Sequence, residues 1–475
     1  MSALRATIFR TRHKTPLTGA ETRSCSQHKL LVVWALFSAA ATAAVAGDAL
    51  DGRPAPPGDT WSLLTDPSNW TVLQQETEIE QWDSSFNSPY AGRNSFLPGG
   101  DGERTFSLTI FLGHKLWDGA ELYYNPEFFQ GHGLGNTVGI AGFPNGEAVK
   151  AAFYQLHYNT SRLFIRQTIG LGGETEKVEA DENQFAETVD VNRLTFSIGK
   201  FSANDFFDDN AYSHDARKQF MNWALWESAA WDYPADIVGY TSGFVAELNT
   251  KDWLLHYGIF LEPTVSNGAT LQTDVAKAWA QVLEVDRRYS WDGHAGMIRP
   301  FLFWNRANMG NYDDSLASAS GVPDITATRA YRSKVGAGLS WDQELTTGLG
   351  AFARLSWDDG RTETWAFTEI DSSVALGLSL QGAPWNRPDD VLGVAVVGSG
   401  LSSEHKAYLA AGGIGLDIGD GRLNYGLEEI GEVYYDVKVC KWLWMTPDFQ
   451  YVDHPGFNRD RGPVPLYALR AHLEF

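Results

Sequence analysis

The sequence predicts an all-β fold, a closed transmembrane antiparallel β-barrel of about sixteen strands, from three observations. Blocks of about ten residues alternate apolar and polar side chains, as strands do when their two faces meet different environments. Beyond residue 46, no apolar run is long enough for a transmembrane helix. The links between the blocks mostly alternate between long and short, which favours a barrel over a sandwich.

Residues 1–46 have the features of a secretory signal peptide. An uncharged apolar run, LLVVWALFSAAATAAVA at 30–46, follows a basic stretch and ends in the small residues that signal peptidase accepts. We therefore expect export and cleavage near Ala46. An uncleaved membrane anchor is the alternative, although the run is short for a span. Residues 47–69 are then a short polar leader in the periplasm, and residues 70–475 are the barrel domain.

Charge and cysteine content exclude several protein classes. The chain has 37 Lys and Arg against 59 Asp and Glu, a formal net charge of −22, and residues 1–46 carry a net +5. The remaining chain therefore carries −27, and such an acidic protein is a poor ligand for nucleic acid. Its remaining cysteine is Cys440, so no intrachain disulfide framework is possible. Aromatic residues make up 13% of the chain, too many for a disordered protein.

Alternation assigns each side chain of a predicted strand to an outer or an inner face. In the segment 372–381, Val374 and Leu376 share one face, and Ser373 and Ala375 share the other. A charged side chain that faces lipid near mid-bilayer costs about 2–4 kcal/mol, so the polar face is expected to line the lumen. The predicted strands are 70–78, 104–113, 119–128, 162–171, 193–201, 239–248, 251–261, 281–290, 296–304, 333–343, 348–357, 372–381, 390–399, 428–438, 441–451 and 465–475.

The last predicted strand, 465–475, has the clearest alternation. Tyr467 and Phe475 lie on one face, and Arg470 and His472 lie on the other. A strand that ends on such an aromatic residue resembles the C-terminal signal of bacterial outer-membrane barrels. We therefore expect the barrel-assembly machinery to recognise Phe475, and outer-membrane lipid and lipopolysaccharide to surround the barrel.

The lengths of the links match an outer-membrane barrel, which has short turns on the periplasmic side and long loops on the external side. Short links include 249–250, 291–293 and 346–348, which are expected to be periplasmic turns. The long links, expected outside the cell, include 79–103, 129–161, 202–238, 262–280, 305–332 and 400–427. The acidic link 172–192 is an exception, because it is long but falls on the short side.

The third external link, 202–238, is the longest, and it is expected to fold inward and narrow the lumen. Residues 216–229 have helical spacing, with Phe220, Trp223 and Trp226 near one face. The alternative is an external cap that packs on these aromatic side chains.

Several long blocks of the sequence resemble carbohydrate-selective porins of the OprB family. They include NPEFFQGHGLGNTVGIAGFPNGEA (125–148), RLTFSIGKFSANDFFDDNAYSHDARKQFMNWALW (193–226) and GDGRLNYGLEEI (419–430). Together with shorter blocks they cover most of the chain from about residue 70 onward. The resemblance implies a single outer-membrane barrel through which sugars diffuse passively, without ATP or a cofactor.

A sugar presents hydroxyl groups around a weakly apolar ring, so a selective channel needs hydrogen-bonding side chains beside aromatic faces. The third external link places such residues together: Asp208, Asp209, Asn210, His214, Asp215, Arg217, Trp223 and Glu227. Alternation places further candidates in the lumen: Glu121, Arg354, Glu432, Asp436 and Arg470. Of the adjacent Arg166 and Gln167 one must break the pattern, and Arg166 is expected to face the lumen because Gln costs less near lipid. Each has an alternative role as an anchor that holds the link against the wall. Replacing Arg354 or Asp209 by alanine is expected to alter sugar block more than folding.

Other functions compete with sugar uptake. No G-x-S-x-G motif, H-E-x-x-H motif or Cys/His cluster suggests an enzyme or a metal site, so neither is expected. A general or cation-preferring small-solute porin is the main alternative, because the excess negative charge would favour cations if it faced the lumen. A closed barrel that serves as an adhesin is another. The barrel is expected to be a monomer or a homotrimer.

Overall fold

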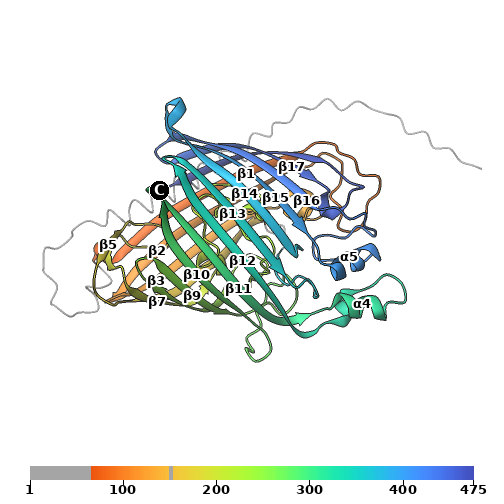
Figure 1. Cartoon of the computed structure of the whole chain (residues 1–475), viewed down its shortest axis with the longest axis horizontal. Helices are drawn as coiled ribbons and strands as arrows, with labels where there is room; N and C mark the ends of the chain where they lie inside the picture. The colour runs from red at the N-terminus through yellow and green to blue at the C-terminus, as the bar shows by residue number, and fades with distance from the viewer. Residues whose placement is uncertain (1–65, 149–152, 368) are drawn as a thin grey trace, which may run out of the picture. The chain divides into compact units, whose positions relative to one another are not determined.

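The computed structural model describes residues 66–148, 153–367 and 369–475. Within the unit Ser68–Phe475, sixteen strands form one closed antiparallel barrel (Figure 1). β1 (Trp70–Asp83) pairs with β18 (Val464–Glu474), which closes the sheet and leaves it without an open edge. The predicted all-β barrel is confirmed, whereas the predicted signal peptide and most of the predicted leader lie outside the described residues.

Each barrel strand corresponds to one predicted segment, and most strands are longer than predicted. Between β1 and β18 the barrel contains β2 (Gly102–Trp117), β3 (Ala120–Gly131), β4 (Phe153–Gly170), β7 (Arg193–Phe201), β8 (Thr241–Asn249), β9 (Trp253–Phe260), β10 (Trp279–Trp291), β11 (His294–Met309), β12 (Ala330–Thr346), β13 (Leu349–Asp358), β14 (Ser372–Gly382), β15 (Arg387–Gly400), β16 (Glu428–Cys440) and β17 (Leu443–Asp453). Each strand pairs with its neighbours in sequence order, apart from β5 and β6, so the barrel is an up-and-down meander.

The remaining elements are short and lie in the links. β5 (Thr175–Val178) and β6 (Glu187–Asp190) form a separate two-stranded sheet. The helices are α3 (Trp223–Trp226), α4 (Tyr312–Ser318) and α5 (Ser403–Ala410). Single 3₁₀ turns are η1 (Pro67–Asn69), η2 (Leu134–Asn136), η3 (Ala203–Asp205), η4 (Ile325–Thr328), η5 (Ala383–Trp385) and η6 (Pro455–Phe457). Figure 1 places α4 and α5 at one end of the barrel and β5 at the other, as expected for long external and short periplasmic links.

The two faces of the sheet have the predicted polarity. In β14, Val374 and Leu376 are 51% and 53% exposed on the outer face, whereas Ala375 is buried on the inner face. In β18, Leu469 is 39% exposed and the neighbouring Arg470 is buried in the lumen. The outer face is therefore an apolar belt suited to lipid, and the charged side chains stay inside.

Aromatic side chains gather at the end of the barrel that carries the short turns. Exposed rings at or beside these turns and at the chain end are Trp117, Trp253, Trp291, Trp442 and Phe475. Trp442 stacks on Phe475, with ring centroids 5.8 Å apart. Such a ring of aromatic residues is typical of the membrane interface of outer-membrane barrels. Among the described residues, no helix is long and apolar enough to cross a membrane.

The acidic link 171–192, on the short-turn side, folds back into the lumen. Phe185 is 5% exposed and lies against Tyr123 of β3, with ring centroids 6.2 Å apart. The Asn183 carbonyl accepts a hydrogen bond from Arg166 Nη1 at 2.7 Å, so Arg166 points inward. The unusual length of this link therefore reflects an inward segment and not an error in the strand count.

The third loop (residues 202–240) also enters the lumen, but the predicted helix over 216–229 is wrong. Only the four residues of α3 are helical there. Phe220 packs on Phe352 of β13, with ring centroids 5.5 Å apart, and belongs to a first buried cluster. Trp223 belongs to a second cluster. The aromatic side chains therefore point in different directions, and no single apolar helix face exists.

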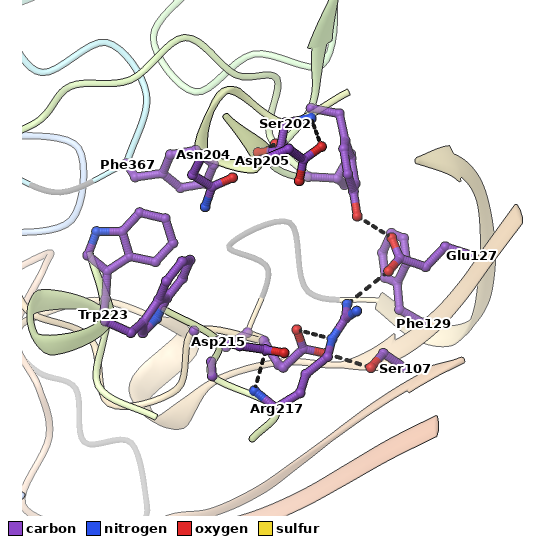
Figure 2. Close-up of a pocket in the computed structure, with 18 of the residues that line it drawn as sticks. Ser107, Glu127, Phe129, Ser202, Asn204, Asp205, Asp215, Arg217, Trp223 and Phe367 are labelled. Atoms are coloured by element: carbon purple, nitrogen blue, oxygen red, sulfur yellow. Dashed lines mark hydrogen bonds and ion pairs between the residues drawn. The ribbon is translucent and has the colours of Figure 1, made fainter. Parts of the chain in front are cut away.

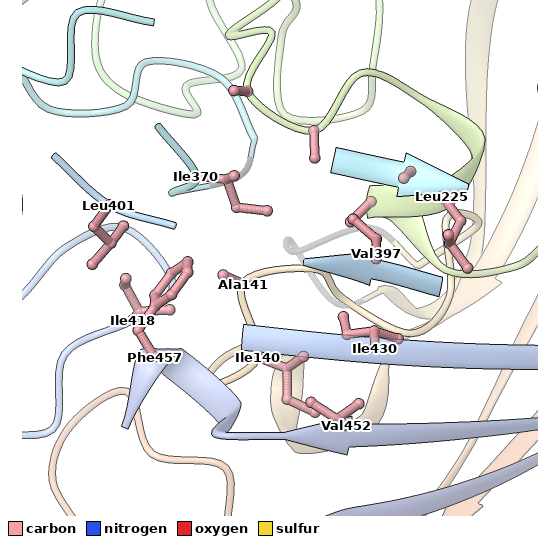
Figure 3. Close-up of a cluster of buried hydrophobic side chains, with 14 of the residues drawn as sticks. Ile140, Ala141, Leu225, Ile370, Val397, Leu401, Ile418, Ile430, Val452 and Phe457 are labelled. Atoms are coloured by element: carbon pink, nitrogen blue, oxygen red, sulfur yellow. The ribbon is translucent and has the colours of Figure 1, made fainter. Parts of the chain in front are cut away.

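The first cluster joins several loops to the barrel wall (Figure 3). Ala141 from the link after β3, Leu225 from the third loop and Ile418 from the link after β15 share it with Ile430 of β16. Apolar side chains from loops far apart in the sequence thus lose their contact with water together. This burial holds the loops over the lumen.

A buried histidine connects two external loops. His405 Nδ1 lies 3.0 Å from Asp371 Oδ2, and its Nε2 lies 3.7 Å from Glu369 Oε1. Burial alone would lower the pKa of His405, but the two carboxylates outweigh it and raise the pKa to about 9. Burial alone would raise the pKa of Glu369, but the hydrogen bond and charge of His405 lower it to about 2.

We expect this connection to weaken as the pH rises through about 9. Because the folded pKa of His405 lies above its unfolded value of about 6.5, its stabilisation is complete below about pH 6.5 and is lost toward about pH 9. Amide hydrogen exchange of residues 401–427, corrected for intrinsic rates, should therefore accelerate above about pH 8. His405→Gln should show the faster exchange at both neutral and high pH. Exchange in the native protein that does not depend on pH would contradict the expectation.

Candidate functional site

Arg354 of β13 holds two points of the third loop against the wall. Its Nε lies 3.1 Å from Asp208 Oδ1, and its Nη1 and Nη2 donate to the carbonyls of Leu225 and Asp208, both at 3.0 Å. The Asp208 carboxylate also accepts hydrogen bonds from the backbone N–H and hydroxyl of Ser228. Both charged side chains are buried, so this ion pair positions the loop.

Two further wall side chains bind the loop backbone directly. Glu432 of β16 accepts the N–H of Met221 at 2.6 Å and that of the next residue at 2.9 Å. Arg470 of β18 donates to the carbonyls of Ala216 and Gln219, both at 2.7 Å. A helix would satisfy such backbone groups internally, so these partners on the wall explain why the loop is mostly not helical.

A cavity of about 240 Å³ beside the third loop is the candidate site (Figure 2). Three aromatic rings form a stack along one side, those of Trp223, Tyr233 and Phe367. The centroids of Trp223 and Tyr233 are 5.7 Å apart, and those of Tyr233 and Phe367 are 4.8 Å apart. Trp223 and Tyr233 are 4% and 2% exposed and Phe367 is partly buried, so the stack is packed into the second cluster and closes one side of the cavity.

The opposite side of the cavity is charged, as Figure 2 shows. Arg217 of the third loop lies between two carboxylates. Its Nη2 is 2.9 Å from Oε1 of Glu127 on β3, and its Nε is 2.8 Å from Oε1 of Glu147 in the link after β3. Arg162 of β4 makes a second pair, with its Nε 2.7 Å from Asp205 Oδ2. These groups can donate and accept hydrogen bonds in fixed directions, which hydroxyl-rich solutes require.

Acidic groups outnumber basic ones around this cavity. Its charged lining consists of Glu127, Glu147, Glu182, Asp205 and Asp215 against Arg162 and Arg217, with His214 beside them. Burial would raise the pKa of Asp215, but Lys218 and Arg217 lower it below its usual value, so the group is ionised. Lys218 in turn lies 3.0 Å from Glu182 Oε1, which connects the third loop to the inward link 171–192.

The structure divides the predicted site residues into groups. His214, Asp215, Arg217 and Trp223 line the cavity, whereas Asp208, Asn210, Arg354, Glu432 and Arg470 hold the third loop in place. On the wall, Glu121 accepts a hydrogen bond from the Tyr123 hydroxyl and Asp436 accepts one from the Thr446 hydroxyl. Arg166 binds the inward link 171–192.

Two predicted residues stand apart from these groups. The Asp209 side chain is 67% exposed and lies 3.7 Å from Arg299. Glu227 is buried, and burial together with the Asp208 charge raises its pKa well above the usual value. Burial therefore favours the protonated form of Glu227, and neither of its carboxyl oxygens has a hydrogen-bond partner among the described residues.

Sequence reasoning missed several residues of the cavity, among them Glu127, Glu147, Arg162, Tyr233 and Phe367. For two of them a signal was present. Glu127 has the same parity as Glu121 on β3, and Arg162 has the same parity as Arg166 on β4. Phe367 comes from the link after β13, and no pattern in the sequence places that link beside the third loop.

A closed barrel with an apolar belt, an aromatic rim and an inward loop that narrows a polar lumen is an outer-membrane porin. The sequence profile described as "Carbohydrate-selective porin, OprB family" matches residues 93–475. The chain therefore belongs to the OprB family of carbohydrate-selective porins, which are channels and not enzymes.

Individual relatives are distant. The chain is 22% identical over 326 residues to Porin AaxA of Chlamydia caviae, a match that covers 67% of this chain and 62% of that protein. It is 29% identical over 122 residues to Porin B of Pseudomonas aeruginosa, covering 25% of this chain and 26% of that protein. The chain thus spans less than two thirds of the length of either relative.

Among solved structures, OprB of Pseudomonas putida at high pH superimposes with a TM-score of 0.64. The two chains are 18% identical, and the match covers 88% of this chain and 96% of the other. At this identity the similarity shows the fold alone, which agrees with the sixteen-stranded barrel.

Proposed function

We propose that monosaccharides or short oligosaccharides diffuse passively through this barrel into the periplasm, past the cavity beside the third loop. The observation that carries the proposal is the aromatic stack of Trp223, Tyr233 and Phe367 opposite Arg217 and its carboxylates. The apolar face of a sugar ring can lie against the partly exposed Phe367, which Trp223 and Tyr233 hold in place, while its hydroxyl groups reach the charged side. Contacts of this kind bind weakly enough to let the solute leave.

Planar-bilayer recordings of the purified barrel test the proposal. Glucose or a maltose-type sugar should reversibly reduce the current, because a bound sugar occupies the constriction. Trp223→Leu should weaken the block about 3- to 10-fold, since an aromatic contact contributes about 0.5–1.5 kcal/mol. Trp291→Leu, on the exposed rim, is the matched control and should leave the block unchanged.

Two outcomes would contradict the proposal. A large, sugar-insensitive and strongly cation-selective current would identify a general or cation-preferring porin. That second candidate is favoured by one observation, the excess of carboxylates over guanidinium groups around the cavity. No current at all would identify a closed barrel.

The remaining partners are proposals that follow from the position of the barrel in the outer membrane. We infer that lipopolysaccharide contacts the external loops. We also infer that the assembly machinery recognises the outward face of β18 together with Phe475, which follows this strand and is 49% exposed. Export through a signal peptide cleaved near Ala46, and a monomeric or trimeric state, stay predictions.

A further inference from the structure

A second cluster of ionisable side chains lies in the lumen wall, away from the cavity. Glu247 of β8, His256 of β9 and Glu284 of β10 lie directly opposite one another across three neighbouring strands. Asp286 lies two residues beyond Glu284 and therefore on the same face. His256, Glu284 and Asp286 are 5%, 1% and 3% exposed, and one potential ligand atom of each lies within 4.8 Å of the others.

Three buried polar atoms of this cluster lack hydrogen-bond partners within the described part of the chain. Neither ring nitrogen of His256 makes a hydrogen bond, and Asp286 Oδ1 makes none either. Buried polar groups are nearly always satisfied, so a histidine and a carboxylate left unsatisfied side by side indicate a bound species.

The geometry fits a metal ion. His256 Nε2 lies 3.4 Å from Asp286 Oδ2. Two ligands that each bind a tetrahedral zinc ion at about 2.0–2.2 Å are separated by about 3.4 Å. Glu284 uses Oε2 to accept the backbone N–H of Asp208 at 2.9 Å, which leaves its other oxygen for an ion.

Glu247 lies on the far side of the imidazole. Its Oε1 is 3.4 Å from His256 Nδ1, the nitrogen that does not face Asp286. Metal-binding histidines usually direct their second nitrogen to a carboxylate, which fixes the ring and increases its basicity. Glu247 is therefore a positioning residue, which would hold the His256 ring in the orientation that directs Nε2 to the metal.

The charge around the cluster also favours a cation. Arg299 is the basic side chain beside it, with its Nε 3.9 Å from Asp286 Oδ2. The guanidinium is shared with Asp342, to which it makes a short contact, and with Asp209 at 3.7 Å. Arg299 is thus shared among three carboxylates, of which Asp286 is the most distant.

We propose that His256, Glu284 and Asp286 bind one divalent transition-metal cation, for which Zn²⁺ is the best match. An imidazole with two carboxylates suits zinc better than calcium or magnesium, which prefer oxygen ligands alone. Through Glu284 and the N–H of Asp208, the ion supports the start of the third loop. The sequence predicted no metal site, because these residues come from two strands, β9 and β10, and form no recognised metal-binding motif.

Calorimetric titration of the chelator-treated barrel with ZnCl₂ tests the proposal. We expect one equivalent to bind and to raise the unfolding temperature. His256→Gln and Asp286→Asn should weaken binding by more than about 100-fold, and Glu247→Gln by about 10-fold. His472→Gln is the matched control, because His472 is a buried lumen histidine that is bonded to Thr77 at 2.8 Å. It should bind zinc as the native barrel does.

Cobalt provides a second readout that a merely structural role would not change. Co²⁺ in the site should give visible absorption bands that disappear in His256→Gln, while heat-modifiable migration confirms that the variant barrel is folded. Absence of saturable zinc binding, or equal binding by His256→Gln, would overturn the proposal. The first result would indicate that His256 contacts only Glu247 and Asp286, without a metal between them.

Discussion

Replacing Arg354 by methionine should release the third loop and lower the free energy of unfolding by about 3–5 kcal/mol. The side chains of Arg354 and Asp208 are 0% and 1% exposed, so the variant would leave a buried carboxylate without its cation. Two backbone carbonyls of the loop would also lose their donor. Single-channel conductance should rise because the loop no longer holds its position, and urea unfolding should measure the lost stability.

The control for this prediction is Arg332→Met on β12. Arg332 lies 2.7 Å from Asp314, but the two side chains are 33% and 54% exposed. Such exposed pairs contribute at most about 1 kcal/mol, so stability and conductance should hardly change. The double variant Arg354→Met with Asp208→Leu should regain part of the stability, because no unpaired charge stays buried. Equal effects of Arg354→Met and Arg332→Met would contradict the anchoring role.

Replacing Arg217 by glutamine should weaken sugar block about 10- to 100-fold, because hydrogen bonds to charged groups contribute about 1.5–3 kcal/mol. The same change removes the positive charge between Glu127 and Glu147. Cation selectivity should therefore increase, which the reversal potential in a salt gradient measures.

The matched control is Lys251→Gln. Lys251 lies 3.2 Å from Glu174, and both side chains are largely exposed on the short-turn side. This variant removes one positive charge from the barrel without touching the cavity, so block and selectivity should stay as in the native protein. Unchanged sugar block in Arg217→Gln would remove Arg217 from the solute path.

The strands and the direction of their side chains could be predicted because both follow from a local pattern. Parity alone assigns Arg354, Arg470, Glu432 and Glu121 to the lumen, and all four are buried there. The energetic reason is simple, since an apolar belt must face lipid and charge must not. Alternation over about ten residues was therefore enough for the barrel.

The conformation of the third loop could not be predicted, because its partners are distant in sequence. Glu432, which binds the N–H of Met221, is 211 residues away along the chain. Helical spacing in 216–229 was a real pattern, but long-range hydrogen bonds to the wall replaced the helix. The structure also changes what we expect from replacing Arg354. The sequence predicted an effect mainly on sugar block, whereas its contacts with Asp208 and Leu225 predict an effect mainly on loop position and stability.

The positions of the loop anchors have a consequence for the order in which the molecule matures. Glu284, Arg354, Glu432 and Arg470 lie on β10, β13, β16 and β18, all of which follow the third loop in the chain. The loop cannot reach its final place until the last strand has arrived, since contacts of such high sequence separation form late. A partly assembled barrel would therefore lack the contacts that hold the third loop in the lumen. Closing the sheet is then also the step that gives the channel its narrow passage.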